Sequence, residues 1–235
     1  MNIDFTQKSG PNLPIYEDAV SICLYRSSEL SWKKHVEPLL DYLDQTLSYD
    51  LLVFCEEEFI PLFADHPNVR VFLVTSSTPG YYRHLWRYFG ANFASEYTNI
   101  WYRGADTPDP APNKTAERTA NLITAQVICW PRLHRRFYEF MGQCRLDKAA
   151  SESLLAYLVK IEPHPDMEDF WTVDEHELSH WWSLNMHKFS TVVVLSRELD
   201  QAQPRAYINH LLTIGRRSIV IKNLSTEEPS TGRWL

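Results

Sequence analysis

Short apolar runs alternate with amphipathic stretches along the first half of the chain. The runs are almost continuously apolar and rich in β-branched residues, which is typical of strands buried on both faces of a sheet. Between them, apolar residues recur at helical spacing, as at Trp32, Val36 and Leu39. This alternation predicts parallel βαβ units with right-handed crossovers. We expect strands over residues 19–25, 51–55, 69–74 and 98–102, with helices over 31–46, 57–64 and 81–97.

The pattern is less regular after residue 110, where a proline-rich stretch interrupts it. A polar, histidine-rich stretch covers residues 164–187 and is not assigned to an element. The apolar and amphipathic segments around it predict a mixed second half. We expect helices over 114–123 and 148–159, and strands over 125–130, 191–195 and 218–222.

Composition narrows the class of protein further. No stretch approaches the roughly 20 apolar residues of a membrane helix, and the N-terminus has no basic-then-apolar signal pattern. The four cysteines are widely spaced and form no CxxC pair, which is typical of reduced thiols. We therefore expect a cytoplasmic protein without a membrane span. The net charge of −7 disfavours general coating of nucleic acid, although residues 130–136 are basic and aromatic.

Ligands of parallel sheets bind where the carboxyl ends of the strands converge. The loops to consider are therefore 26–30, 56–58, 75–80 and 103–110. Two carboxylates, Asp106 and Asp109, follow the last expected strand of the first half. Carboxylates in this position can hold the Mg²⁺ or Mn²⁺ that neutralises a phosphate group. The alternative is that they only form a turn, which Asp and Pro both favour.

The stretch Arg103-Gly104-Ala105-Asp106-Thr107 resembles the DxD-type motif that ends the fourth strand of glycosyltransferases of the GT-A fold. It also resembles the Arg-Asp-Ala-Asp-Ser version of this motif in a bacterial and viral glycosyltransferase-like group. Gly104 stands where that version has its first Asp, so one metal-binding carboxylate is missing. The resemblance spans roughly residues 19–195. It implies a GT-A-like, Rossmann-like, mostly parallel sheet flanked by helices, with a mixed C-terminal part.

The length and hydrophobic content of the chain favour one domain, over residues 1–222, and the polar composition of residues 223–235 indicates a tail. The division of this domain follows from the resemblance. Residues 19–110 would form the nucleotide-binding half and 111–222 the acceptor half. Manganese or magnesium would assist, and the donor would be a nucleotide-sugar, with a UDP-sugar favoured.

The resemblance also implies roles for individual residues. Tyr25, Arg26 and Ser27 would meet the base and ribose of the donor. Arg83 and Arg87 would bind the diphosphate, because a guanidinium can bind two of its oxygens. Their alternative is ion pairing on a helix surface. The remaining donor-binding residue would be Arg103, and the general base would be Glu152.

His176-Glu177-Leu178-Ser179-His180 matches HExxH, which places two imidazoles one helical turn apart beside a glutamate base. A zinc peptidase also needs a third ligand, and the metzincin spacing places it at Met186. Zinc peptidase is therefore a lesser alternative. By the glycosyltransferase resemblance, His176 or His180 would instead be a further metal ligand. The third possibility is that both are solvated.

These observations favour a glycosyltransferase that moves a sugar to an acceptor hydroxyl. The acceptor classes left open are a saccharide, a small molecule and a hydroxymethylated DNA base. A base in DNA would have to be flipped out by a surface such as residues 130–136. The main alternative is a catalytically degenerate relative that binds a nucleotide or a partner without turnover, as Gly104 suggests.

Overall fold

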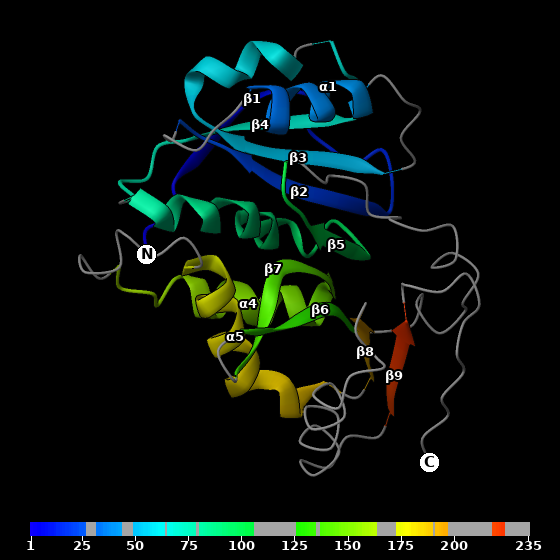
Figure 1. Ribbon diagram of the computed structural model, residues 1–235. Coiled ribbons are helices and arrows are strands. Elements are labelled where there is room, and N and C mark those ends of the chain that lie inside the picture. The colour runs from blue at the N-terminus through cyan, green and yellow to red at the C-terminus, as the bar shows by residue number, and fades with distance from the viewer. Residues whose placement is uncertain are drawn as a thin grey trace.

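A computed structural model gives the architecture as a mixed α/β fold built on one nine-stranded sheet within the residues it describes (Figure 1). The order of strands across the sheet is β1-β4-β3-β2-β5-β7-β6-β8-β9. The described residues are 1–26, 32–43, 49–63, 65–78, 80–105, 126–134, 137–163, 173–189, 191–196 and 218–223.

Four neighbouring strands form the parallel core of the sheet. They are β2 (Asp18–Leu24), β3 (Asp50–Cys55), β4 (Val69–Val74) and β5 (Asn99–Tyr102). Strand β3 pairs in parallel with β2 and β4, and β2 pairs in parallel with β5. This confirms the predicted parallel arrangement, with strand bounds within one residue of those expected.

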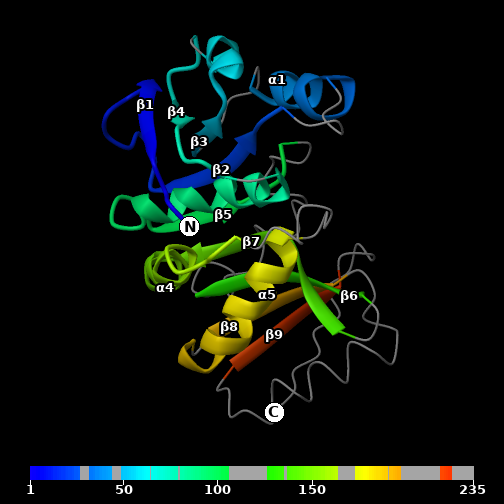
Figure 2. The same cartoon turned by 90° about the vertical axis from the view of Figure 1, so that its left-hand side faces the viewer.

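Helical segments cover both faces of the parallel core (Figure 2). One face packs against η3 (Gly80–Phe93), which in turn contacts α4 (Lys148–Leu158) and α5 (Val173–Asn185). The other face packs against η1 (Trp32–Val36), α1 (Glu37–Leu43) and η2 (Glu57–Phe63). Because both faces are buried, the strands read as apolar runs and not as alternating patterns. In η3, Tyr82, Leu85, Tyr88 and Ala91 are all buried, which matches the three-residue repeat of 3₁₀ geometry.

The segment η3 packs unusually close to β2 at Gly90. A Cβ at Gly90 would lie 2.5 Å from Oγ of Ser21 and 2.7 Å from its Cβ. The Ser21 hydroxyl also donates a hydrogen bond to the backbone carbonyl of Arg87. The absence of a side chain at residue 90 therefore sets the distance between helix and sheet.

An antiparallel strand at the edge, β1 (Phe5–Ser9), was not predicted. It pairs with β4, with Phe5 opposite Val74. The ring of Phe5 packs edge-on against Phe54 and Phe72, with centroids 5.2 and 5.4 Å away. Phe5 is the only large apolar residue of β1, so the strand has too little pattern to be recognised in the sequence.

The second half of the sheet is mixed, as expected. Strand β7 (Phe137–Asp147) is antiparallel to both β5 and β6 (Val127–His134), and it was not predicted. Strands β8 (Thr191–Ser196) and β9 (Ser218–Asn223) confirm two predicted strands and run parallel to one another.

Two helices cover this second half. Helix α4 confirms the prediction over 148–159 and is capped by Asp147, whose side chain accepts a hydrogen bond from Ala150 N. The histidine-rich stretch contains α5, followed by the short helical turn η5 (Met186–Lys188). The helix expected over 114–123 lies outside the described residues. Among the described helices, none is long and apolar enough to cross a membrane.

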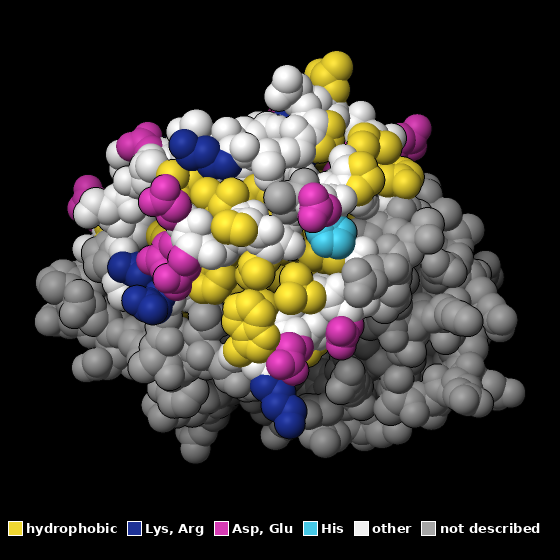
Figure 3. Space-filling view, turned by 90° about the horizontal axis from the view of Figure 1, so that it is seen from above, with side chains coloured by type: hydrophobic (Ala, Val, Ile, Leu, Met, Phe, Trp, Pro, Cys, Tyr) yellow, Lys and Arg dark blue, Asp and Glu magenta, His cyan; other side chains and the backbone are white. Residues whose placement is uncertain are grey.

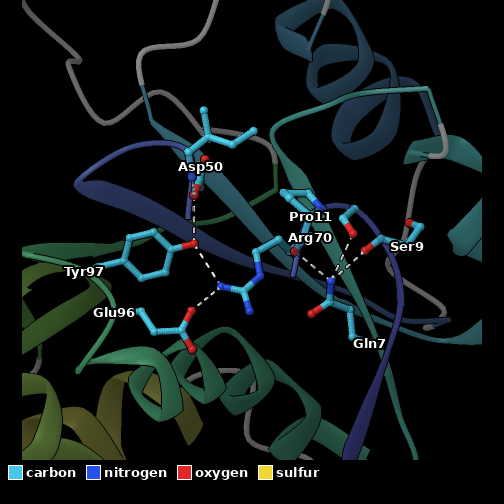
Figure 4. A network of polar contacts seen from close by, with 9 residues as sticks. Gln7, Ser9, Pro11, Asp50, Arg70, Glu96 and Tyr97 are labelled. Atoms are coloured by element: carbon cyan, nitrogen blue, oxygen red, sulfur yellow. Dashed lines mark hydrogen bonds and ion pairs between the residues drawn. The ribbon is translucent and has the colours of Figure 1, made fainter. Parts of the chain in front are cut away.

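A buried polar network lies near the amino ends of the parallel strands (Figure 4). The Tyr97 hydroxyl donates to Asp50 Oδ2 at 2.9 Å, and Arg70 Nη1 donates to Tyr97 Oη at 3.2 Å and to Glu96 Oε2 at 2.7 Å. Asp50 Oδ2 also accepts from the backbone N–H of Ile15. Burial raises the pKa of the Asp50 carboxyl despite these hydrogen bonds. The network ties β3 and β4 to the segment before β5.

Candidate functional site

The strand order creates a switch point between β2 and β5. From β2 the chain adds β3 and then β4 on one side, and it returns to add β5 on the other side. Loops that leave neighbouring strands in opposite directions open a crevice at the carboxyl ends of those strands. Here these loops begin with Tyr25 and Arg26 after β2, and with Arg103 after β5. This edge is therefore the candidate site.

Tyr25 lies beneath the surface of this edge. Its side chain is buried, and its ring packs edge-on against His84 and Trp86 with centroids 5.3 and 5.7 Å away. The ring therefore contributes to the wall between β2 and η3. Arg26 is the first exposed residue after β2, and its guanidinium Nε lies 3.6 Å from Glu58 Oε1. Ser27 lies outside the described residues.

Glu56 joins three elements at the carboxyl edge. It follows β3 directly, and its own N–H donates to the Leu24 carbonyl at the end of β2. Its carboxylate accepts the backbone N–H of Arg26 at 2.6 Å and the Arg83 guanidinium at 2.9 Å. Both carboxylate oxygens are therefore engaged. Glu56 was not singled out from the sequence, although the loop that contains it was.

Arg83 is held on three sides at the start of η3. Besides its ion pair with Glu56, its Nε donates to the Thr78 carbonyl at 3.3 Å. Its guanidinium carbon lies 5.9 Å from the centroid of the Trp86 ring, a cation–π distance. Trp86 in turn donates from Nε1 to Thr78 Oγ1 at 3.1 Å. About a third of the Arg83 side chain remains exposed.

The other two arginines of the predicted site are more enclosed. Arg87 follows Arg83 by about one turn, is half-buried, and donates from Nε to the His84 carbonyl at 3.2 Å. Arg103 is buried, and its backbone N–H continues the β2–β5 pairing by donating to the Ser21 carbonyl. The structure thus brings the backbone N–H of Arg26 and the guanidinium of Arg83 together at Glu56, whereas Arg87 lies about one turn further along η3 and Arg103 directly follows β5.

Three other predicted site residues remain, namely Asp106, Asp109 and Glu152. Asp106 and Asp109 lie outside the described residues. Glu152 is exposed on α4, and this helix begins beside the first residue of β5 because Asp147 pairs with Asn99. The preceding residue, Ser151, faces inward and accepts a hydrogen bond from the Tyr102 hydroxyl at 3.0 Å. Glu152 is thus on the solvent side of α4.

The HExxH residues lie on α5. His176 and His180 are both exposed, and Glu177 is partly buried. Oε2 of Glu177 accepts a hydrogen bond from the Tyr157 hydroxyl at 2.5 Å. Among the described residues, no group of three or more His, Cys, Asp or Glu side chains is placed to hold a metal ion. The part of the chain that the structure describes therefore provides no third ligand for a peptidase-type zinc.

The face covered by α1 carries a mixture of side-chain types (Figure 3). Acidic and basic side chains are interspersed there among exposed hydrophobic ones. The exposed hydrophobic residues of the described chain include Leu13 and Trp32. Among the side chains described on this face, the basic ones form no continuous patch of the kind that binds a nucleic-acid backbone.

The strand order, the parallel core and the helices on both faces define a Rossmann-like α/β fold of the nucleotide-binding type. The crystal structure of 4-diphosphocytidyl-2C-methyl-D-erythritol synthase from Anaerococcus prevotii DSM 20548 shares this fold, with a TM-score of 0.52 and 13% sequence identity. The match covers 84% of this chain and 96% of that chain. No protein-family model and no curated protein matches the sequence. The likeness at this identity is evidence for the fold alone.

Proposed function

We propose that the protein binds a nucleotide-sugar at the carboxyl edge of β2, β3 and β5 and transfers its sugar to an acceptor hydroxyl. The observation that carries this proposal is the convergence of Arg26 and Arg83 beside the switch point of a parallel sheet. Switch points of such sheets are where nucleotides bind, and guanidinium groups are suited to diphosphate oxygens.

Within this proposal, the residues after β2 contact the nucleoside, and the exposed side of Arg83 contacts the diphosphate. Tyr25 supports the site from beneath, since its ring is covered by His84 and Trp86. Arg87 and Arg103 add positive potential from deeper in the fold. The leaving diphosphate gains charge as the bond to the anomeric carbon breaks, so cationic groups around it stabilise the transition state.

A divalent cation would supply positive charge beside the bound diphosphate. Glu56 already balances the charge of Arg83, and Glu58 lies near that of Arg26. A diphosphate that entered this cluster would therefore need further positive charge. We propose that Asp106, with Asp109 as a second candidate, holds Mn²⁺ or Mg²⁺ for this purpose. Glu152 remains a proposed base for the acceptor, on the condition that the acceptor lies over the exposed face of α4.

The first test measures donor binding. Wild-type protein is titrated with UDP in the presence of Mn²⁺, followed by calorimetry, and compared with Arg83→Gln. Loss of a charge-assisted contact worth about 1.5–3 kcal/mol predicts that binding weakens roughly tenfold or more. Lys8→Gln removes one exposed positive charge on β1 and is the matched control. Equal affinities of Arg83→Gln and Lys8→Gln would reject Arg83 as a phosphate ligand.

The second test measures turnover. A panel of nucleotide-sugars is incubated with the protein and Mn²⁺, and free nucleoside diphosphate is measured as the product of sugar transfer or slow donor hydrolysis. Asp106→Asn should abolish this release while its thermal midpoint stays within a few degrees, because loop carboxylates contribute little to folding. Donor binding without any turnover would instead identify the degenerate, nucleotide-binding alternative.

Nucleotidyl transfer is a second candidate, because the name of the structurally similar synthase states that its product carries a diphosphocytidyl group. The two reactions break different bonds. Sugar transfer releases a nucleoside diphosphate, whereas nucleotidyl transfer from a nucleoside triphosphate to a phosphorylated alcohol releases pyrophosphate. Incubation with nucleoside triphosphates and sugar phosphates, with a pyrophosphate assay, therefore separates them. Pyrophosphate release with no activity on nucleotide-sugars would replace the first proposal by the second.

A further inference from the structure

Helix α5 presents two imidazoles to solvent on one side. His176 and His180 are four residues apart within the helix, and both are exposed. Side chains with this spacing are neighbours on the helix surface, with Cβ atoms about 6 Å apart. Two imidazoles at this separation can bind the same metal ion.

The ring of His180 is held in a defined orientation by a neighbouring helix. Its Nδ1 lies 3.1 Å from the hydroxyl oxygen of Tyr157 on α4. The Tyr157 hydroxyl donates its proton to Glu177 Oε2 at 2.5 Å, so its oxygen is left to accept a hydrogen bond. The partner that donates is Nδ1–H of His180. This hydrogen bond favours the tautomer in which Nε2 carries a lone pair.

Tyr157 is suited to this role because it lies between the two groups it joins. Its hydroxyl contacts Glu177 Oε2 on one side and His180 Nδ1 on the other. A chain from carboxylate to hydroxyl to imidazole is the kind of support that fixes the orientation of metal-binding histidines and increases their basicity.

We propose that His176 and His180 bind a divalent transition-metal ion of the class that prefers imidazole, such as Zn²⁺, Ni²⁺ or Cu²⁺. The ion is held at the exposed surface of α5, with His180 Nε2 as one ligand and the His176 ring as the other. Tyr157 and Glu177 are positioning residues for His180. Since no third His, Cys, Asp or Glu joins the pair in the described part of the chain, water occupies the remaining coordination positions.

This assignment gives the HExxH residues a role different from that of a zinc peptidase. In a peptidase the glutamate acts as a base on the metal-bound water. Here its Oε2 is engaged by Tyr157, so we assign it to orienting the neighbouring imidazole. The site lies on α5, whereas the proposed donor site lies at the carboxyl edge of β2, β3 and β5. The proposal therefore does not depend on sugar transfer.

The test is calorimetric titration of the full chain with Zn²⁺ alone. We expect one ion per chain in the wild-type protein, and loss of this binding in His176→Ala and in His180→Ala. The matched control is His66→Ala, which removes a partly exposed imidazole from the loop between η2 and β4 and should leave binding unchanged. Because both α5 histidines are exposed, their removal should leave the thermal midpoint within a few degrees.

Tyr157→Phe tests the positioning role separately. Removal of the support should weaken Zn²⁺ binding by about tenfold without changing its stoichiometry. Zn²⁺ binding that persists in either single α5 histidine variant, or its absence from the wild-type protein, would overturn the site. Unchanged affinity in Tyr157→Phe would overturn the positioning role and leave a simple pair of surface histidines.

Discussion

Removal of one hydroxyl from the buried network in Figure 4 is expected to destabilise the fold measurably. The Tyr97 hydroxyl joins Asp50, which is fully buried, to Arg70, which is 3% exposed. Asp50 Oδ1 and Arg70 Nε are themselves buried without a hydrogen-bond partner among the described residues. In the variant Asp50 would keep the hydrogen bond from the Ile15 N–H and Arg70 its ion pair with Glu96, but both contacts to the Tyr97 hydroxyl would be lost. Hydrogen bonds to charged groups are worth about 1.5–3 kcal/mol each, so Tyr97→Phe should cost about 3 kcal/mol.

For a chain of this size, that loss corresponds to a thermal midpoint lowered by roughly 6–12 °C. Circular dichroism melts and urea unfolding would measure the change. The matched control is Tyr42→Phe, because the Tyr42 hydroxyl is buried without a hydrogen-bond partner among the described residues. The same chemical change should there be neutral or slightly stabilising. If Tyr97→Phe and Tyr42→Phe shifted the midpoint equally, the reasoning about the network would be refuted.

Two further predictions concern the framework of the site. Gly90→Ala should lower the free energy of unfolding by about 1–3 kcal/mol in a melt, because the new Cβ meets both side-chain atoms of Ser21; at an ordinary helix position the same change would stabilise. Burial raises the pKa of Asp50, so the folded state favours its protonated form. As pH falls from 7 towards about 4, the wild-type protein should therefore gain stability relative to Asp50→Asn, and this gain should be lost as pH rises through the folded-state pKa. Urea unfolding at several pH values measures the difference, and a difference independent of pH would contradict the assignment.

The elements predicted well are those whose burial is visible within a single segment. Residues 51–55 are apolar at nearly every position because both faces of β3 are covered, so the strand needs no partner to be recognised. Strand β7, by contrast, cannot be recognised from its own sequence. Its sequence FYEFMGQCRLD mixes polar and apolar residues without a clear period, and its pairing with β5 and β6 defines it as a strand. Such long-range pairing cannot be deduced from local pattern.

The spacing of apolar residues in α5 could have predicted this helix from the sequence. Leu178, Trp181, Trp182 and Asn185 are buried, and their spacing of three, one and three residues is that of one helix face. The histidines and carboxylates around these positions kept the stretch from being assigned to an element. His176 and His180 lie on the solvent side, and Glu177 contacts Tyr157 of the neighbouring helix α4. The buried positions define α5 as a helix, and the exposed positions include the two histidines of the HExxH pattern.

The candidate site, too, was predicted only in part from the sequence. Arg83 was expected near the site from the resemblance to glycosyltransferases. The alternation of elements indicated that the loops after β2, β3 and β5 converge, and Arg26 begins the first of these loops. The alternation could not indicate that Glu56 would engage both residues at once, because that contact joins three loops separated in sequence.

Glu56 lowers the net positive charge of the candidate site. Two arginines that would attract a diphosphate are already paired with two glutamates, so these four side chains together carry no net charge. A diphosphate carries at least two negative charges, and the partly exposed Glu56 would repel it while Arg83 attracts it. Binding therefore requires either that Arg83 exchange Glu56 for phosphate or that a cation enter with the ligand. Only the second route adds positive charge to the site, so we propose that donor binding requires Mn²⁺ or Mg²⁺, and affinity that is unchanged without either ion would refute this route.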